Sequence, residues 1–149
     1  MALQSIGTNG WEARPAQSKA SVSVASRVLT ANQVLDLAAK AAAEVEDTSG
    51  WVRPLERGSN RLRLVVRDLT RADDEPVLHF DVEVDRAVGR VTARTVIQTF
   101  VVKQSGVAAL LPVARRKIAG FSAYRAFMER YADALSDVDP DVQVSYSGD

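Results

Sequence analysis

Few side chains in this sequence form a pattern that would support catalysis or metal binding. His79 is the only histidine among the 149 residues, and the chain contains no cysteine. Metal sites built from several histidines or from thiolates, and thiol nucleophiles, are therefore excluded. A serine nucleophile would need a histidine base within hydrogen-bond reach, and the spacing around His79 places no serine beside it. We therefore predict no catalytic residue and no metal site, which favours a binding protein over an enzyme.

The acidic and glycine-containing segments do not match the loops that hold calcium or phosphate. The segments "RADDEP" (71–76) and "DVDPD" (137–141) lack a glycine and a terminal glutamate at EF-hand spacing. The segments "GRVTAR" (89–94) and "SGVAALLP" (105–112) lack the Walker pattern and the glycine spacing of dinucleotide-binding loops. We therefore predict that the protein uses no cofactor.

A stripe of mostly aromatic side chains recurs at helical spacing near the end of the chain. Phe121, Tyr124, Met128, Tyr131 and Leu135 follow a 3,4,3,4 spacing, which puts them on one face of a helix. Core packing is the usual role of such a stripe, and a ligand wall and a partner-binding surface are the two alternatives. Burial of these side chains at about 1.5 to 3 kcal/mol each would make the stripe a main source of stability in every case.

Three consecutive cations, Arg115, Arg116 and Lys117, precede the stripe near the start of the predicted closing helix. The helix dipole disfavours positive charge at a helix N-terminus, so this placement calls for a compensating anion. We interpret the cluster as a candidate anion-binding site for a phosphate or a carboxylate. Compensation by the acidic residues 73–75, or by solvent, is the simpler alternative.

The residues before the stripe predict the elements that would position it. Residues 20–28 alternate as a strand, and Thr30 and Gln33 form a capping box at the start of a helix with helical apolar spacing. Residues 51–60 predict a short strand, which Pro54 marks as an edge strand or a bulge.

The closing helix is predicted within residues 111–139. Pro112 suits a first helical turn, and Gly120 either lets the backbone approach a neighbour or breaks the helix in two. The segment "VQVSYS" (142–147) is consistent with one short final strand.

Three consecutive strands between residues 61 and 103 alternate apolar and polar side chains. Their predicted inward residues are Leu62, Leu64, Val66, Leu78, Phe80, Val82, Val84, Val91, Ala93, Thr95, Ile97, Thr99 and Val101. Pairing across the "RAVG" turn (86–89) is predicted to set Asp85 opposite Arg90 and Asp81 opposite Arg94. The outward face then carries paired charges and no aromatic residue. We interpret it as a solvated face, with an interface as the alternative.

Composition indicates one ordinary globular domain. Hydrophobic residues make up 46% and charged residues 26% of the chain, both near the average for globular proteins, and we predict a mobile tail at 1–18 and a single domain at 19–149. Basic and acidic residues balance at 19 each, so we predict no nucleic-acid partner.

The sequence predicts neither a signal peptide nor a membrane span. No run approaches the roughly 18 apolar residues of a membrane span, and the first residues lack a signal-peptide pattern. We therefore predict no membrane span and a cytoplasmic location. Arg supplies 15 of the 19 basic residues, which favours a GC-rich bacterial genome.

The predicted fold class is α+β: an antiparallel curved sheet in the order β-α-β-β-β-β-α, with a short final strand, packed on a long C-terminal helix. This order, together with the closing "YRAFMERYADAL" helix (124–135), resembles the TATA-box-binding-protein half-domain and the helix-grip group, which includes Bet v 1, START domains and polyketide cyclase-like proteins. The resemblance implies a sheet wrapped around the final helix, with space for an apolar ligand between them. The spacing Pro112, Lys117, Gly120, Tyr124, Phe127 and Met128 is also similar to the endings of actinobacterial proteins, a resemblance that implies no activity.

The leading hypothesis is a non-catalytic protein that binds a small apolar or amphipathic ligand between the sheet and the C-terminal helix. Tyr124, Thr95 and Thr99 would orient the ligand. The candidate ligand-binding residues are Trp51, Phe80, Thr95, Ile97, Thr99, Phe121, Tyr124, Met128 and Tyr131. One alternative is an interaction module without a ligand cavity, such as a homodimer formed through a sheet edge or through the segment "GVAALLPVA" (106–114). A third is a cyclase- or hydrolase-like enzyme that uses one buried carboxylate and a tyrosine.

Overall fold

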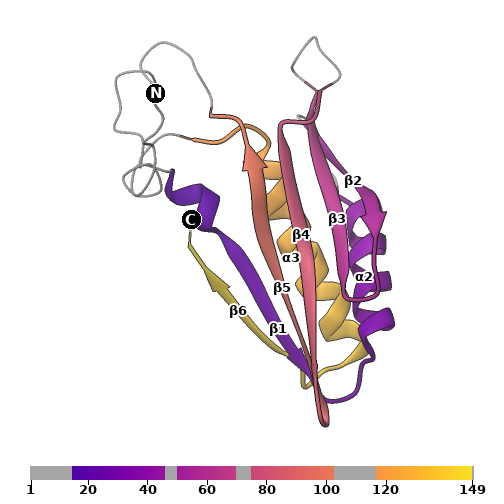
Figure 1. The fold of residues 1–149 in the computed structure, drawn as a ribbon. Helices are drawn as coiled ribbons and strands as arrows, with labels where there is room; N and C mark the ends of the chain where they lie inside the picture. Colours follow the sequence, from indigo (N-terminus) through magenta and orange to yellow (C-terminus); the bar gives the residue numbers. More distant parts are fainter. Residues whose placement is uncertain (1–14, 46–49, 70–74, 103–116, 149) are drawn as a thin grey trace, which may run out of the picture.

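The structure of the chain is a computed structural model that describes residues 15–45, 50–69, 75–102 and 117–148. The elements are η1 (Ala16–Lys19), β1 (Ser21–Ser26), α2 (Ala31–Ala43), β2 (Gly50–Arg57), β3 (Arg61–Asp68), β4 (Leu78–Ala87), β5 (Arg90–Phe100), α3 (Phe121–Val138) and β6 (Gln143–Ser147) (Figure 1). The predicted α+β class, the element order and the final strand are confirmed. The tail predicted for residues 1–18 falls mostly outside the described residues, but Ala16–Lys19 form η1 and Ser18 is buried.

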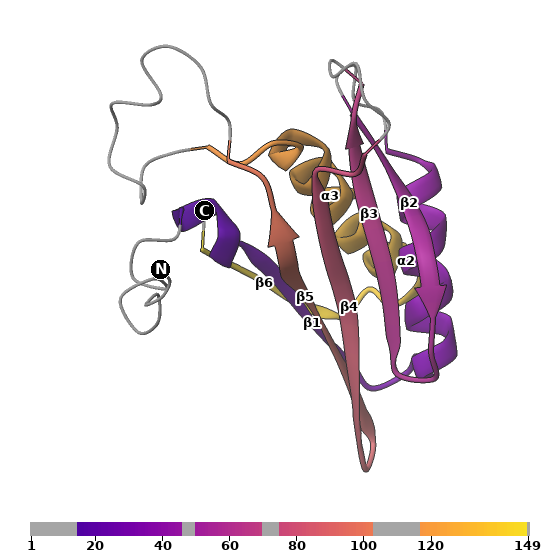
Figure 2. The same ribbon diagram turned by 45° about the horizontal axis from the view of Figure 1, so that its top comes forward.

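The six strands form one antiparallel sheet in the order β2-β3-β4-β5-β1-β6. Both long helices lie on the same face of this curved sheet, so within the described part of the chain the other face carries no helix (Figures 1 and 2). β2 and β6 are its two edges. Among the described residues, no helix is both long enough and apolar enough to cross a lipid bilayer.

The helix α2 begins as the sequence predicts. The Thr30 side chain accepts a hydrogen bond from the Gln33 amide, and the Gln33 side chain accepts one from the Thr30 amide, which completes the capping box. Val34, Leu35 and Ala38 then face the core and are buried. This helix connects β1, inside the sheet, to the distant edge strand β2.

The helix α3 begins at Phe121, directly after Gly120, whose φ of 79° lies in the left-handed region. A Cβ atom at this glycine would come within 2.8 Å of a Val66 methyl carbon and 2.9 Å of a Val77 methyl carbon. Of the two roles predicted for Gly120, the close backbone approach is therefore present. The helical turn predicted at Pro112 lies outside the described residues.

The β4–β5 hairpin differs from its prediction in two ways. Its turn is Val88–Gly89, so Asp85 pairs with Thr92 and Asp81 with Val96. The predicted register was therefore wrong by two residues, which preserves which face each side chain occupies. Further along, the partners shift from His79↔Thr99 to Phe80↔Ile97, which leaves Gln98 as an extra residue in a β-bulge.

Candidate functional site

Seven of the nine predicted ligand-binding residues lie together on the helix-covered face and are buried. These residues are Phe80, Thr95, Ile97, Phe121, Tyr124, Met128 and Tyr131. The Phe80 ring lies 4.8 Å from the ring of Tyr124 and 5.0 Å from that of Phe127, between centroids. Such distances are those of aromatic rings in direct contact. The aromatic stripe of α3 therefore packs directly against the sheet.

The hydroxyl groups of these residues form hydrogen bonds with other parts of the chain. Tyr124 Oη donates to the Ala20 carbonyl at 2.6 Å and lies 2.8 Å from Thr95 Oγ1. Because the single Tyr124 proton goes to Ala20, Thr95 donates to Tyr124, and Thr95 Oγ1 in turn accepts from the Val22 amide at 3.0 Å. The ladder between β1 and β5 ends at the pair Ser23↔Arg94. These hydrogen bonds hold the residues of the chain that precede Ser23.

Tyr131 is also hydrogen-bonded within the chain, since its hydroxyl donates to the Val34 carbonyl at 3.2 Å. Burial raises the pKa of both Tyr124 and Tyr131 above the ordinary 10.0, so both hydroxyls are neutral at physiological pH. Within the described residues, every buried side-chain nitrogen or oxygen has a hydrogen-bond partner. At the centre of the sheet–helix interface, therefore, no polar side-chain atom of the described residues needs a ligand as its hydrogen-bond partner.

The other two candidates, Trp51 and Thr99, lie on the open face of the sheet. Trp51 is opposite Arg67 in the β2–β3 ladder, and the guanidinium carbons of Arg53 and Arg67 lie 4.8 and 5.4 Å from its ring centroid. The prediction that the open face carries no aromatic residue was therefore wrong. Thr99 is exposed and its Oγ1 lies 3.0 Å from His79 Nδ1. Its predicted inward orientation was wrong because the bulge at Gln98 reverses the alternation.

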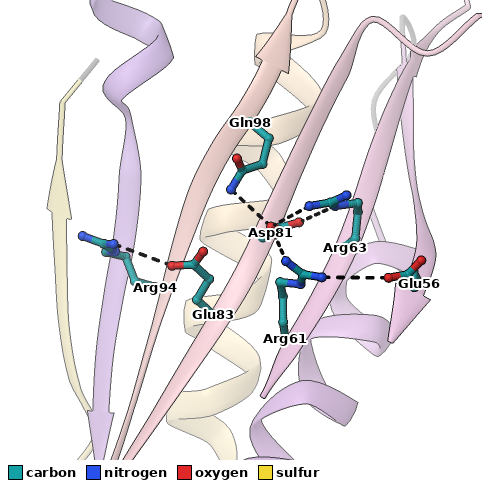
Figure 3. A network of polar contacts seen from close by, with 7 residues as sticks. All are labelled: Glu56, Arg61, Arg63, Asp81, Glu83, Arg94 and Gln98. Atoms are coloured by element: carbon teal, nitrogen blue, oxygen red, sulfur yellow. Dashed lines mark hydrogen bonds and ion pairs between the residues drawn. The ribbon is translucent and has the colours of Figure 1, made fainter. Parts of the chain in front are cut away.

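Asp81 occupies the centre of a polar network on the open face (Figure 3). Arg63 donates to both carboxylate oxygens, from Nε at 2.9 Å and from Nη2 at 3.2 Å. Gln98 Nε2 donates to Asp81 Oδ2 at 3.2 Å, and Arg61 Nη1 lies 3.9 Å from the same oxygen. The Asp81 side chain is 0% exposed, while that of Arg63 remains 33% exposed. The bond with Asp81 is the main reason that the pKa of Arg63 is raised.

The position of Asp81 bears on acid–base chemistry. A buried carboxylate is a candidate general acid or base only where a reacting group can reach it. Here the carboxylate is surrounded by cationic and amide donors on the open face, whereas Tyr124 lies on the helix-covered face of the same sheet. The two side chains therefore do not share a site.

Two surface hollows of the described residues meet at the first turns of α3. The larger, about 510 Å³, is lined by Lys117, Phe121, Arg125 and Glu129 among others, and reaches Gly50 on β2. The smaller, about 270 Å³, lies between α3 and the strands β1 and β6. Its lining residues are Ala20, Ser21, Phe121, Arg125, Met128, Glu129, Tyr146, Ser147 and Gly148. Phe121, Arg125 and Glu129 contribute to both hollows.

The meeting point of the hollows combines an apolar floor with charged walls. The Phe121 ring lies beneath the Arg125 guanidinium, whose carbon is 5.2 Å from the ring centroid. Lys117 is exposed and lines the larger hollow, and no side chain among the described residues caps the start of α3. Asp68 and Glu129 supply negative charge on the same walls. Arg115 and Arg116 of the predicted anion site lie outside the described residues.

Phe121, Met128 and Lys117 of this site were among the residues predicted from the sequence, whereas Arg125, Glu129 and Tyr146 were not. Phe121, Arg125 and Glu129 recur every four residues, so they form a stripe that borders the aromatic face of the helix. That spacing could have revealed Arg125 and Glu129. Tyr146 could not be found in this way, because only the pairing of β6 with β1 brings it beside α3.

Among the described residues, no group of three or more His, Asp or Glu side chains could hold a metal ion. Comparisons of the chain with protein-family models, curated proteins and solved structures found no match.

Proposed function

We propose that the protein is a non-catalytic binding module that takes a small amphipathic molecule in the two hollows that meet over Phe121. The observation that carries this proposal is their junction: one hollow is lined by Lys117 and the start of α3, the other by Met128 and Tyr146. The larger volume, about 510 Å³, is within the usual range of small-molecule sites. The site lies between the sheet and the C-terminal helix, at the margin of their interface.

The chemistry of the walls suggests how such a ligand would lie. An anionic group would sit at the start of α3, where the helix dipole and Lys117 favour negative charge. The apolar part would cover Phe121 and Met128, whose side chains form the floor of the smaller hollow. Glu129 and Asp68 would repel further negative charge, so a single anionic group fits better than several.

The margin of the interface fits a ligand better than its centre does. In the centre, Phe80 and Tyr124 are 0% exposed and in ring contact, so a ligand would have to displace packed side chains. At the margin the two hollows are already open, so a ligand can enter without displacing the packed core. We therefore assign Phe80, Tyr124 and Tyr131 to the support of the site, with Phe121 and Met128 as its direct ligand contacts.

The test is a thermal-shift screen of the full chain against medium-chain fatty acids, lysophospholipids and aromatic carboxylates. A ligand that binds only the folded state, present at 100 times its Kd, should stabilise the fold by about 2.7 kcal/mol. Ser122→Trp would fill the larger hollow from an exposed position, whereas Ser136→Trp places the same side chain at an exposed position outside both hollows.

We expect the melting temperature of the wild type and of Ser136→Trp to rise with the same compound, and that of Ser122→Trp to remain unchanged. The proposal fails if no compound in the three classes stabilises the wild type. It also fails if the stabilisation is equal in both tryptophan variants, because the ligand would then bind elsewhere.

A further inference from the structure

The two edges of the sheet differ in how they are protected against pairing with another strand. β2 contains Pro54, a register shift between Pro54 and Glu56, and the exposed charges of Arg53, Glu56 and Arg57. Proline, bulges and charges are the usual devices that prevent edge-to-edge association. β6 has the sequence "QVSYS", which contains neither charge nor proline, and its ladder with β1 runs without a register shift. Among the described residues, only the β2 edge therefore carries such protection.

The orientation of the β6 backbone follows from a hydrogen bond one strand away. The Val22 amide donates to Thr95 Oγ1, on the β5 side of β1, so the backbone groups of Val22 point away from β6. Tyr146, which lies opposite Val22, is therefore in a non-hydrogen-bonded pair. The backbone N–H and C=O groups of Tyr146 and of Val144 consequently point outward, beyond the edge of the sheet.

We propose that β6 pairs antiparallel with β6 of a second copy of this chain, about a two-fold axis through Ser145. In this register Val144 lies opposite Tyr146 of the second copy and exchanges backbone hydrogen bonds with it. Ser145 lies opposite its own equivalent in a non-hydrogen-bonded pair, and Gln143 lies opposite Ser147. The two sheets then form one continuous sheet across the axis.

A second copy fits this edge because the strand is complementary to itself. Val144 and Tyr146 both lie on the helix-covered face, since they pair with Val24 and Val22, so apolar side chains meet across the axis. Tyr146, which is 54% exposed in the monomer, would gain an apolar neighbour. Gln143, Ser145 and Ser147 meet on the open face, and within β6 no charge opposes a like charge. A strand of five residues buries little area, so we expect a weak, concentration-dependent dimer.

Sedimentation velocity of the full chain from about 10 µM to 1 mM tests this pairing, because dissociation constants of weak dimers fall in that range. Ser145→Lys and Ser145→Asp each place like charges opposite one another on the axis, and each should weaken the dimer about tenfold or more. An equimolar mixture of the two variants should restore dimerisation, because Lys then lies opposite Asp. Leu55→Lys, at an exposed position on the β2 edge, is the matched control and should leave the dimer unchanged.

Cross-linking provides a second measurement that does not depend on affinity. The chain has no cysteine, so Ser145→Cys introduces a single thiol whose Cα would lie about 4.5 Å from its equivalent, within the range of disulfides. Under mild oxidation this variant should form covalent dimers faster than Leu55→Cys. The proposal is overturned if the wild type remains monomeric up to 1 mM, if the mixed variants do not associate, or if the two cysteine variants cross-link at the same rate.

Discussion

Phe80 and Asp81 are adjacent on β4, point to opposite faces of the sheet and are both 0% exposed. Phe80 is buried by the helical layer of the fold, since aromatic side chains of α3 lie against it. No helix of the described segments lies above Asp81, which is covered by the side chains of Arg61, Arg63 and Gln98 (Figure 3). A face of a sheet without a covering layer can therefore still bury a charge, provided that long partner side chains surround it.

The two kinds of burial should respond differently to truncation. Loss of the Phe80 ring leaves a cavity between α3 and the sheet that tightly packed neighbours fill only in part. Loss of the Asp81 carboxylate leaves Arg63 without its partner, but Arg63 is already one-third exposed and can regain contact with water. We therefore expect the helix-covered face to carry the larger part of the stability.

The largest expected effect is that of Phe80→Ala. Removal of a fully buried phenylalanine ring should lower the free energy of unfolding by about 3 to 5 kcal/mol. Urea denaturation of the full chain, followed by circular dichroism, measures this loss. Leu55→Ala, at a position 59% exposed, should change the stability by less than about 0.5 kcal/mol. A loss below about 1 kcal/mol for Phe80→Ala would mean that the ring is not packed as described.

A smaller effect is expected for Asp81→Ala on the open face. The variant removes the acceptor of three hydrogen bonds and should cost about 1 to 3 kcal/mol. Glu83→Ala is the matched control: Glu83 lies two residues along on the same face, is 43% exposed, and meets Arg94 only at 3.7 Å. Its loss should cost about 0.5 kcal/mol or less. Equal losses in the two variants would show that the burial of Asp81 contributes nothing beyond a surface ion pair.

Most of the fold could be predicted because its signals are local. The capping box at Thr30 and Gln33 marked the start of α2, and alternation along β3, β4 and β5 marked three strands. Pro54 correctly indicated an edge strand with a bulge. The spacing of Phe121, Tyr124, Met128 and Tyr131 identified the buried face of α3. Each of these patterns follows from the geometry of a single element.

The errors arose where geometry depends on partner strands. Nothing in the residues around Gln98 signals the bulge that turns Thr99 to the open face. The side of Trp51 depends on its pairing with Arg67, which lies in another strand. Alternation also predicted the direction of Asp81 correctly but could not predict its burial, because the covering groups come from β3 and β5.

The candidate site was predictable only in part for the same reason. Phe121, Met128 and Lys117 come from one stretch of sequence, and the local pattern predicted all three. The opposite walls come from Ala20 at the start of β1 and from Tyr146 in β6, which are far apart in the sequence. Their contribution depends on β6 pairing with β1 across more than a hundred residues.

The smallest expected effect concerns the buried tyrosines at alkaline pH. Burial raises the pKa of Tyr131 above 10.0 in the folded chain, whereas in the unfolded chain the hydroxyl ionises near 10. The stabilisation from keeping Tyr131 neutral is therefore complete below pH 10 and is lost as the pH rises further. Because unfolding then releases a proton, each such tyrosine should lower the stability by up to about 1.4 kcal/mol per pH unit above 10.

Tyr131→Phe isolates this contribution, because it removes the hydroxyl and keeps the ring beside Phe127. At pH 8 the variant should be about 1 kcal/mol less stable, since its bond to the Val34 carbonyl is lost. Between about pH 10 and 11.5 the free energy of unfolding, measured with urea, should fall less steeply with pH in the variant than in the wild type. The reason is that unfolding of the variant releases about one proton fewer. Tyr146→Phe, at a position 54% exposed, should reduce the slope less. If both variants kept the wild-type slope, the neutral hydroxyl of Tyr131 would not contribute to the stability of the helix-covered face. The helix-covered face would then differ in stability from the open face, where the buried group is the charged Asp81, through side-chain packing alone.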